Sequence, residues 1–193
     1  MSVFWELAGY ALLAVFAENL VLTGGIGSSR MLRAARKPKE LLPYSALLCF
    51  FTLCTSLVTS LLEPWLNRVD KDQLFRPLVY TSCAAILYIV VAVGLRLCLP
   101  ERFERYKAML PTTSINCIVV AMPFLVSERQ LDFGHIVALS LGAGVGFVLA
   151  VWLAAEGIKR INNASMARAF LGLPALFIYL GILSLAFLGF VGR

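Results

Sequence analysis

Several side chains that could do chemistry lie together near the middle of the chain, in the stretch MLPTTSINCIVVAMPF at Met109–Phe124. Thr113, Ser114, Asn116 and Cys117 lie in its first turns, whereas everything downstream to Val126 is apolar. A cysteine thiolate is a nucleophile and a metal ligand, and its reactivity depends on the groups around it. This concentration of polar groups at the start of an apolar segment makes Cys117 the first candidate for a functional side chain.

The other candidate residues have simpler interpretations. The remaining four cysteines lie within or at the ends of apolar segments and form no CxxC pattern, so we interpret them as small buried hydrophobes. His135 is the only histidine and we expect it at the membrane interface, since one histidine supports neither a metal site nor a triad. The three glycines of LGAGVGF follow no strand, so they indicate close helix packing rather than a nucleotide loop. These residues are Cys49, Cys54, Cys83 and Cys98, and Gly142, Gly144 and Gly146.

The elements that position these side chains follow from composition. The chain has 193 residues, of which 60% are hydrophobic and 15% are charged, and its mean hydropathy is +0.85. Soluble domains are less apolar and more highly charged, so the sequence predicts an all-α integral membrane protein. The net charge of +6 is not accompanied by basic runs interleaved with aromatic residues. This argues against nucleic-acid binding.

Six segments are long and apolar enough to cross a bilayer as helices of about 20 residues. Little chain remains between them, so we expect one membrane domain over residues 1–193 with no soluble domain. The N-terminal segment lacks the basic start of a signal peptide and carries Glu6 and Glu18 instead, so we expect it to remain as the first helix. The six segments are Phe4–Leu22, Leu41–Leu62, Leu78–Leu99, Met109–Val126, Phe133–Ala155 and Ala169–Val191.

Lysine and arginine predict the orientation, because loops on the cytoplasmic side of a membrane are enriched in these residues. The first, third and fifth loops contain twelve of the 17 basic residues, and the second and fourth loops with the termini contain five. We therefore expect both termini on the outer side of a bacterial or archaeal plasma membrane. The basic side would face anionic lipid headgroups.

The two halves of the chain, about 1–100 and 101–193, each hold three predicted helices, so the second half must cross the membrane in the opposite sense. ENLVL at Glu18–Leu22 is weakly similar to NCIVV at Asn116–Val120, which aligns Asn19 with Asn116. Both stretches adjoin a helix that we expect to be short or broken. Inverted repeats with interrupted helices place functional sites near the membrane midplane. Glu18 has two open interpretations, a snorkelling interfacial residue or part of an ion pathway.

Four motifs carry a resemblance to a known family. The chain resembles the A-type subunit of Rnf complexes and its E-type counterpart in Nqr complexes, nearly from end to end. The closest similarities are Asn116-Cys117 after Pro111 and the threonines, and SLAFLGF at Ser184–Phe190. The motifs are NLVLTGGIGSSRML, LPTTSINCIVV, GAGVGFVLAVWLAA and RAFLGLPALFIYLGILSLAFLGF.

The resemblance implies a membrane subunit that pairs with a homologue of inverted topology, beside flavin-bearing and iron–sulfur subunits. Together the two homologues would hold a [2Fe–2S] cluster that passes electrons across the membrane, coupled to Na⁺ or H⁺ movement. Cys117 matches one cysteine ligand of the family, with Thr113 and Ser114 hydroxyls and helix amides beside its sulfur. Asn19 and Asn116 would shape the ends of the broken helices, and Gly27 would allow close backbone approach. Catalysis proper would belong to the flavins and partner subunits.

The chain departs from the family pattern at the second ligand. Ser29 stands where the family has a cysteine, Arg30 replaces the following proline, and Glu18-Asn19 replaces an Asn-Asn pair. Serine is a poor substitute for a thiolate in a four-cysteine site. Three hypotheses stay open: the cluster binds with one ligand changed, a neighbour such as Cys49 or Cys54 supplies the sulfur, or the cluster is lost. The alternative function is a small inverted-repeat transporter or redox-silent scaffold that uses Glu18 and the Thr/Ser/Asn cluster.

Overall fold

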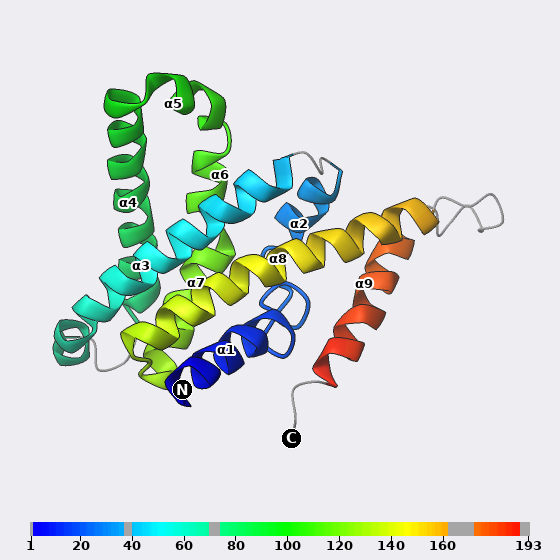
Figure 1. Ribbon diagram of the computed structural model, residues 1–193, viewed down its shortest axis with the longest axis horizontal. Helices are drawn as coiled ribbons and strands as arrows, with labels where there is room; N and C mark the ends of the chain where they lie inside the picture. Colours follow the sequence, from blue (N-terminus) through cyan, green and yellow to red (C-terminus); the bar gives the residue numbers. More distant parts are fainter. Residues whose placement is uncertain (1, 37–39, 70–73, 162–171, 190–193) are drawn as a thin grey trace. The chain divides into compact units, whose positions relative to one another are not determined.

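The structure is a computed structural model that describes residues 2–36, 40–69, 74–161 and 172–189. These residues form nine α-helices and contain no strand, which confirms the prediction of an all-α protein (Figure 1). The chain divides into two compact units, one of residues 1–45 and 142–193 and the other of residues 46–141. Each unit is described by itself below.

The first unit contains α1 (Ser2–Val15), α2 (Ser28–Ala35), most of α8 (Phe133–Ile161) and α9 (Leu173–Leu188). Its helices pack through small residues of α8. A Cβ atom added at Gly142 would lie 2.6 Å from both the Ala11 carbonyl oxygen and the Ala14 Cβ of α1. A Cβ atom added at Gly157 would lie 2.4 Å from the Tyr179 ring of α9. The interpretation of the α8 glycines as packing residues is therefore confirmed at Gly142.

We predict opposite effects for alanine at two glycines of this unit. Gly142→Ala forces α1 away from α8, and overpacking of this kind costs about 1–3 kcal/mol. Gly181→Ala on α9 meets no atom within 4 Å, so its higher helix propensity leaves stability unchanged or raises it by up to about 1 kcal/mol. Thermal unfolding of the detergent-solubilised protein measures both. Equal melting temperatures for the two variants would contradict the close packing of α1 on α8.

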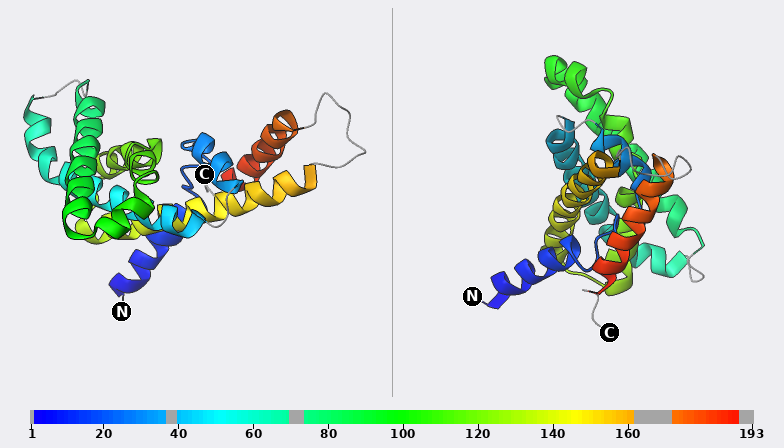
Figure 2. Two further views of the ribbon diagram at one scale, coloured as in Figure 1. Left: turned by 90° about the horizontal axis from the view of Figure 1, so that it is seen from above. Right: turned by 90° about the vertical axis from the view of Figure 1, so that its right-hand side faces the viewer.

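The second unit contains most of α3 (Leu41–Val69), together with α4 (Arg76–Cys98), α5 (Pro100–Tyr106), α6 (Leu110–Ser114) and α7 (Cys117–Arg129). The short helix α5 connects the end of α4 to the start of α6 (Figure 2). This connection brings α4 alongside α6 and α7. The buried Tyr80 ring of α4 meets the Phe124 ring of α7 edge-on, with centroids 4.8 Å apart.

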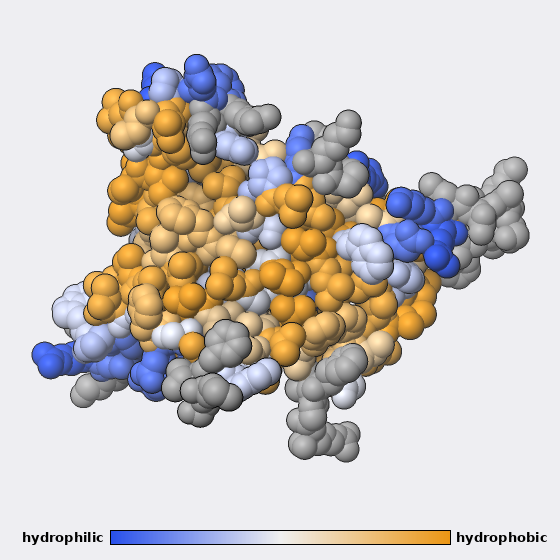
Figure 3. Space-filling view, viewed as in Figure 1, coloured by the Kyte–Doolittle hydropathy of each residue, from blue (hydrophilic) through white to orange (hydrophobic). Residues whose placement is uncertain are grey.

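Four of the six predicted membrane segments coincide with helices long and apolar enough to cross a bilayer. The first and last are shorter in the described residues, since their apolar helices cover Trp5–Val15 and Pro174–Leu188. The prediction of one helix over Phe4–Leu22 is therefore wrong beyond Val15, whereas the expected break in this segment is present. Apolar side chains cover much of the visible face (Figure 3), as helices facing lipid require. The four long spans are Leu41–Arg68, Arg76–Cys98, Leu110–Arg129 and Phe133–Ile161.

Candidate functional site: interrupted helices and a buried ion pair

The first unit contains an interrupted helix at the position that the sequence predicts. Helix α1 ends at Val15, and turns lead to α2 at Ser28. Gly25 and Gly27 in this connection have positive φ angles of 66° and 81°, a conformation that glycine adopts without steric cost. The left-handed Gly27 directly precedes α2, and its carbonyl oxygen accepts from the Arg30 and Met31 amides.

Asn19 holds this interruption together. Its side chain is buried, with a residue exposure of 1%. The Asn19 Nδ2 donates to the carbonyl oxygens of Val15 at 2.9 Å and Gly146 at 3.1 Å. Its Oδ1 accepts from the amides of Val21 and Leu22, both at 3.1 Å. One amide side chain thus pairs three backbone groups of the broken segment, those of Val15, Val21 and Leu22, and joins them to the Gly146 carbonyl of α8.

Two further predicted residues lie in or beside this break. Glu18 is half-buried, and its backbone amide donates to the Leu13 carbonyl at 2.7 Å. Ser29 is the second residue of α2, and its side chain is exposed. The position at which the sequence analysis expects a ligand therefore falls in the first turn of α2, where the helix leaves backbone amides without intrahelical partners.

The second unit contains the other interrupted helix. Helix α6 ends at Ser114 and α7 begins at Cys117, so the chain leaves the helical path at Ile115 and Asn116. Asn116 is buried and extended, with φ −103° and ψ 141°, and its side chain accepts from the Ile118 amide at 3.4 Å. This is the geometry of a helix N-cap. Asn19 and Asn116 therefore have similar roles, since each side chain accepts from backbone amides at the helix interruption of its own unit.

The hydroxyls and the thiol next to Asn116 point to different partners. The Thr113 hydroxyl donates to the Met109 carbonyl at 2.7 Å, and the Ser114 hydroxyl makes a long contact of 3.4 Å to the Pro111 carbonyl. Both residues are buried, whereas Cys117, the first residue of α7, is exposed. The Cys117 thiol is thus available to a group outside this chain, while the two hydroxyls bond within α6 or to the residue before it.

The described residues bring together no three His, Cys, Asp or Glu side chains that could hold a metal ion. Cys49, Cys54 and Cys83 are half-buried on α3 and α4, and Cys98 is exposed at the end of α4. A cluster bound here would therefore need most of its ligands from another chain. Cys117 fits such a shared site, and Ser29 offers only a hydroxyl at the second position.

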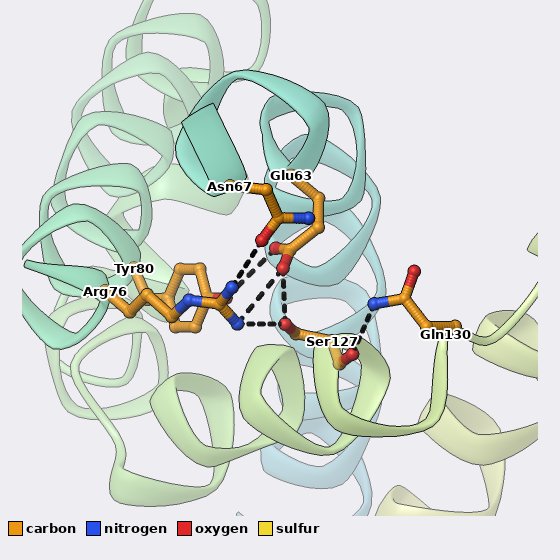
Figure 4. A network of polar contacts seen from close by, with 6 residues as sticks. All are labelled: Glu63, Asn67, Arg76, Tyr80, Ser127 and Gln130. Carbon is orange, nitrogen blue, oxygen red and sulfur yellow. Dashed lines mark hydrogen bonds and ion pairs between the residues drawn. The ribbon is translucent and has the colours of Figure 1, made fainter. Parts of the chain in front are cut away.

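The structure also shows a buried ion pair that the sequence analysis missed. Glu63 of α3 and Arg76, the first residue of α4, approach to 3.1 Å between Oε1 and Nη1, and their side chains are only 11% and 10% exposed. Ser127 of α7 joins them, because its hydroxyl accepts from Arg76 Nη1 at 2.5 Å and donates to Glu63 Oε1 at 2.5 Å. Figure 4 shows the three side chains converging from three helices.

Two more side chains complete this network. The buried Tyr80 hydroxyl donates to Glu63 Oε2 at 3.2 Å, and Arg76 Nη2 donates to Asn67 Oδ1 at 2.5 Å. Both oxygens of Glu63 are therefore paired, as burial of a charge requires. The predicted segments Leu41–Leu62 and Leu78–Leu99 leave Glu63 and Arg76 in the loop between them. A signal was present, since Thr52, Ser56, Thr59 and Glu63 recur every three or four residues and so share one helix face.

A cavity of about 410 Å³ adjoins this network within the second unit. Hydroxyl, amide and carboxylate side chains make up most of its wall, and two helix prolines contribute as well. Gln130 and Asp132 are exposed, so the cavity reaches the surface at the end of α7. The lining residues are Thr59, Ser60, Glu63, Pro64, Asn67, Pro123, Val126, Ser127, Gln130, Leu131 and Asp132.

Comparisons with known proteins agree with the membrane helices. Residues 7–193 match the family model described as "Rnf-Nqr subunit, membrane protein". The E-type subunit of the Na(+)-translocating NADH-quinone reductase of Pseudoalteromonas translucida is 28% identical over 194 residues, covering 93% of this chain and 94% of that protein.

Two further relatives, one from each kind of complex, are similar to the same extent. The A-type subunit of the ion-translocating oxidoreductase complex of Syntrophotalea carbinolica is 27% identical over 179 residues, covering 93% of each chain. The E-type subunit of the Na(+)-translocating NADH-quinone reductase of Chromohalobacter salexigens is 26% identical over 193 residues, again covering 93% of each chain. Because the family model matches nearly the whole chain, this protein belongs to the Rnf-Nqr family of membrane subunits.

Proposed function

We propose that this protein is a membrane subunit of an ion-translocating oxidoreductase complex of the Rnf/Nqr type, in a bacterial or archaeal plasma membrane. In this role it helps to pass electrons across the membrane, coupled to movement of Na⁺ or H⁺. The observation that carries the proposal is the match of residues 7–193 to the family, together with relatives of both complex types along 93% of the chain.

The proposal includes partners. A homologous subunit of inverted topology, flavin-bearing subunits and iron–sulfur subunits would surround the chain. The exposed Cys117 and Ser29 support a partner at these positions. Affinity purification of the tagged chain from its native membrane tests this part. We expect a second subunit of the same family and flavin fluorescence in the eluate, and a chain that purifies alone would overturn the proposal.

The cofactor proposal concerns Cys117. Its thiolate would serve as one ligand to a [2Fe–2S] cluster that the homologous subunit shares, and such a cluster carries single electrons when bound. Its place in the first turn of α7, with unused helix amides nearby, suits a thiolate. Ser29 leaves this chain one thiolate short of the family pattern, so an oxygen ligand or a sulfur from another residue would complete the set.

Iron analysis of the purified complex tests the ligand role. We expect Cys117→Ala to lower bound iron by about two atoms per complex, the content of one such cluster, and to remove its EPR signal. Cys98→Ala is the matched control, because Cys98 is also exposed at a helix end, and it should retain both signals. Unchanged iron and EPR signals in Cys117→Ala would rule out this cysteine as a ligand.

Orientation and internal symmetry are part of the same proposal. Both termini would face outward, supported by the twelve basic residues in the first, third and fifth loops. Two inverted three-helix repeats would account for the two interrupted helices, since each break carries a buried asparagine that pairs nearby backbone amides. A terminal tag that a protease added to intact cells cannot reach would contradict the orientation.

A second candidate function is a redox-silent scaffold or small transporter on the same fold. Ser29 favours it, because this position offers no thiol. Under this hypothesis the polar groups at the helix breaks and Glu18 would contact an ion or solute. Normal ion transport by a complex that contains no iron at this position would favour the second candidate over the first.

A further inference from the structure

A row of buried hydroxyls runs along α3 from the cavity of the second unit. Thr52, Thr55, Ser56 and Thr59 all have residue exposures of 2% or less. Their spacing of three or four residues places them on neighbouring positions of one helix face. Thr59 also lines the cavity, together with Ser60. We call Thr52, Thr55, Ser56 and Thr59 the hydroxyl row.

The hydroxyls within this row differ in their partners. Thr52 and Thr59 donate to carbonyl oxygens of the preceding turn, at 2.8 and 2.9 Å. Thr55 Oγ1 and Ser56 Oγ, one turn from the cavity, are fully buried and have no hydrogen-bond partner among the described residues. An unsatisfied buried hydroxyl costs about 1–3 kcal/mol. Buried polar atoms of this kind commonly contact water or an ion.

The cavity wall supplies oxygen atoms that are not committed to the Glu63–Arg76 pair. Thr59 and Ser60 donate their hydroxyl protons to α3 carbonyls, so the oxygen lone pairs remain to accept or to ligate. Pro64 has no amide hydrogen, which leaves the Ser60 carbonyl without its usual helical donor. Hard cations bind hydroxyl, carbonyl and carboxylate oxygens of this kind.

The charges of the wall favour a cation. Arg76 balances Glu63 through direct contact, so the second carboxylate, Asp132 at the exposed rim, leaves the described lining residues with a net negative charge. Clefts of one charge sign within low-dielectric surroundings concentrate counter-ions. The rim thus attracts cations, while the deeper wall replaces part of their hydration shell with neutral oxygens.

We propose that this cavity is a cation vestibule that binds a hydrated monovalent cation of the Na⁺ class and leads it to the hydroxyl row of α3. The proposal rests on the ion-translocating function proposed above and assigns a place of cation entry or exit within this chain. Glu63 and Ser127 line the cavity, and their contacts with Arg76 hold α4 against α3 and α7 beside it. Asp132 sets the charge preference at the rim.

Thiol labelling of the detergent-solubilised complex tests the vestibule. A Ser60→Cys variant is treated with a cationic trimethylammonium or an anionic sulfonate methanethiosulfonate, and modification of residue 60 is followed by mass spectrometry. Each rate is divided by the rate of the same reagent with a small free thiol, because a negatively charged thiolate reacts faster with a cationic reagent in any surroundings. In these normalised rates, which are used throughout, we expect the cationic reagent to react about 10-fold faster than the anionic one. Na⁺ should slow the cationic reaction relative to choline at equal ionic strength. Leu61→Cys, on the exposed apolar face, should stay unreactive under the detergent.

Two charge variants in the Ser60→Cys background make this test specific. Asp132→Asn should abolish the preference for the cationic reagent. Glu128→Gln removes an exposed carboxylate of α7 that does not line the cavity, so the preference should remain. Equal rates for the two reagents, no effect of Na⁺, or equal effects of the two charge variants would each overturn the proposal.

A cysteine at a second position of the cavity and a measurement of complex assembly separate failure of the vestibule from failure of folding. Thr59→Cys repeats the measurement if Ser60→Cys does not fold, and an unreactive thiol at both positions in folded protein also overturns the vestibule. Co-purification with the other subunits is recorded for every sample. A complex that assembles but fails the labelling test contradicts the vestibule alone, whereas a chain that does not assemble contradicts the proposed function.

Discussion

Replacing Glu63 by alanine is expected to destabilise the protein by about 3–5 kcal/mol, because it leaves the buried Arg76 charge without its partner. The Arg76 guanidinium is in contact with the Glu63 carboxylate at 3.1 Å, and its side chain is 10% exposed. The substitution also removes the acceptor of the Ser127 and Tyr80 hydroxyls. Thermal or denaturant unfolding in detergent measures the loss.

A double variant separates the cost of the unpaired charge from the cost of lost packing. With Glu63 and Arg76 both replaced by methionine, no unpaired charge remains, and we expect recovery of most of the lost stability. Glu128→Ala is the control, since Glu128 is exposed and surface substitutions of this kind change stability by about 0.5 kcal/mol or less. A Glu63→Ala variant as stable as the Glu128→Ala variant would show that the pair is not buried in the protein.

Replacing Asn19 by alanine is the second change for which we expect a large effect. The substitution leaves the carbonyls of Val15 and Gly146 and the amides of Val21 and Leu22 without their side-chain partner. Each buried group left unpaired costs about 1–3 kcal/mol, so the total reaches several kcal/mol unless water replaces the side chain. Unfolding of the purified variant in detergent measures the total.

Asn116→Ala provides the matched comparison. Asn116 accepts from the Ile118 amide across a long contact of 3.4 Å, and loss of an N-cap of this kind costs about 1 kcal/mol. A larger loss for Asn116→Ala than for Asn19→Ala would contradict the assignment of Asn19 as the principal brace of its helix break. The two asparagines are aligned in sequence, but we expect Asn19 to contribute more to the free energy of unfolding than Asn116.

Hydropathy predicted the membrane helices of this protein well because continuous apolar runs are a local property of the sequence. The helices over Leu41–Arg68, Arg76–Cys98 and Phe133–Ile161 begin within two residues of the predicted segments. The break after Val15 was less well located, since apolar residues continue at Leu20, Val21 and Leu22 beyond Glu18 and Asn19. Its position depends on Asn19, whose contact with Gly146 joins residues 127 positions apart.

The local sequence also indicated the helix start at Cys117, because proline, hydroxyl residues and asparagine mark a helix start wherever they occur together. The local sequence indicated the wrong environment for Glu63 and Arg76, because both lie at the ends of a charged connection between two apolar segments. Whether such charges are solvated depends on the helix that covers them. Here Ser127, 64 residues from Glu63, closes the network.

The sequence by itself determined the membrane environment, the helical fold class and the family. It also determined that a cysteine and a serine stand at the two expected ligand positions. These properties depend on residue type and on spacing within a single segment. Only the tertiary structure decided which polar groups are buried together, because contacts such as Asn19 to Gly146 and Glu63 to Ser127 form when distant segments pack. The free energy of burying a polar group depends on the partner that packing supplies, and that partner is not encoded by any neighbouring residue.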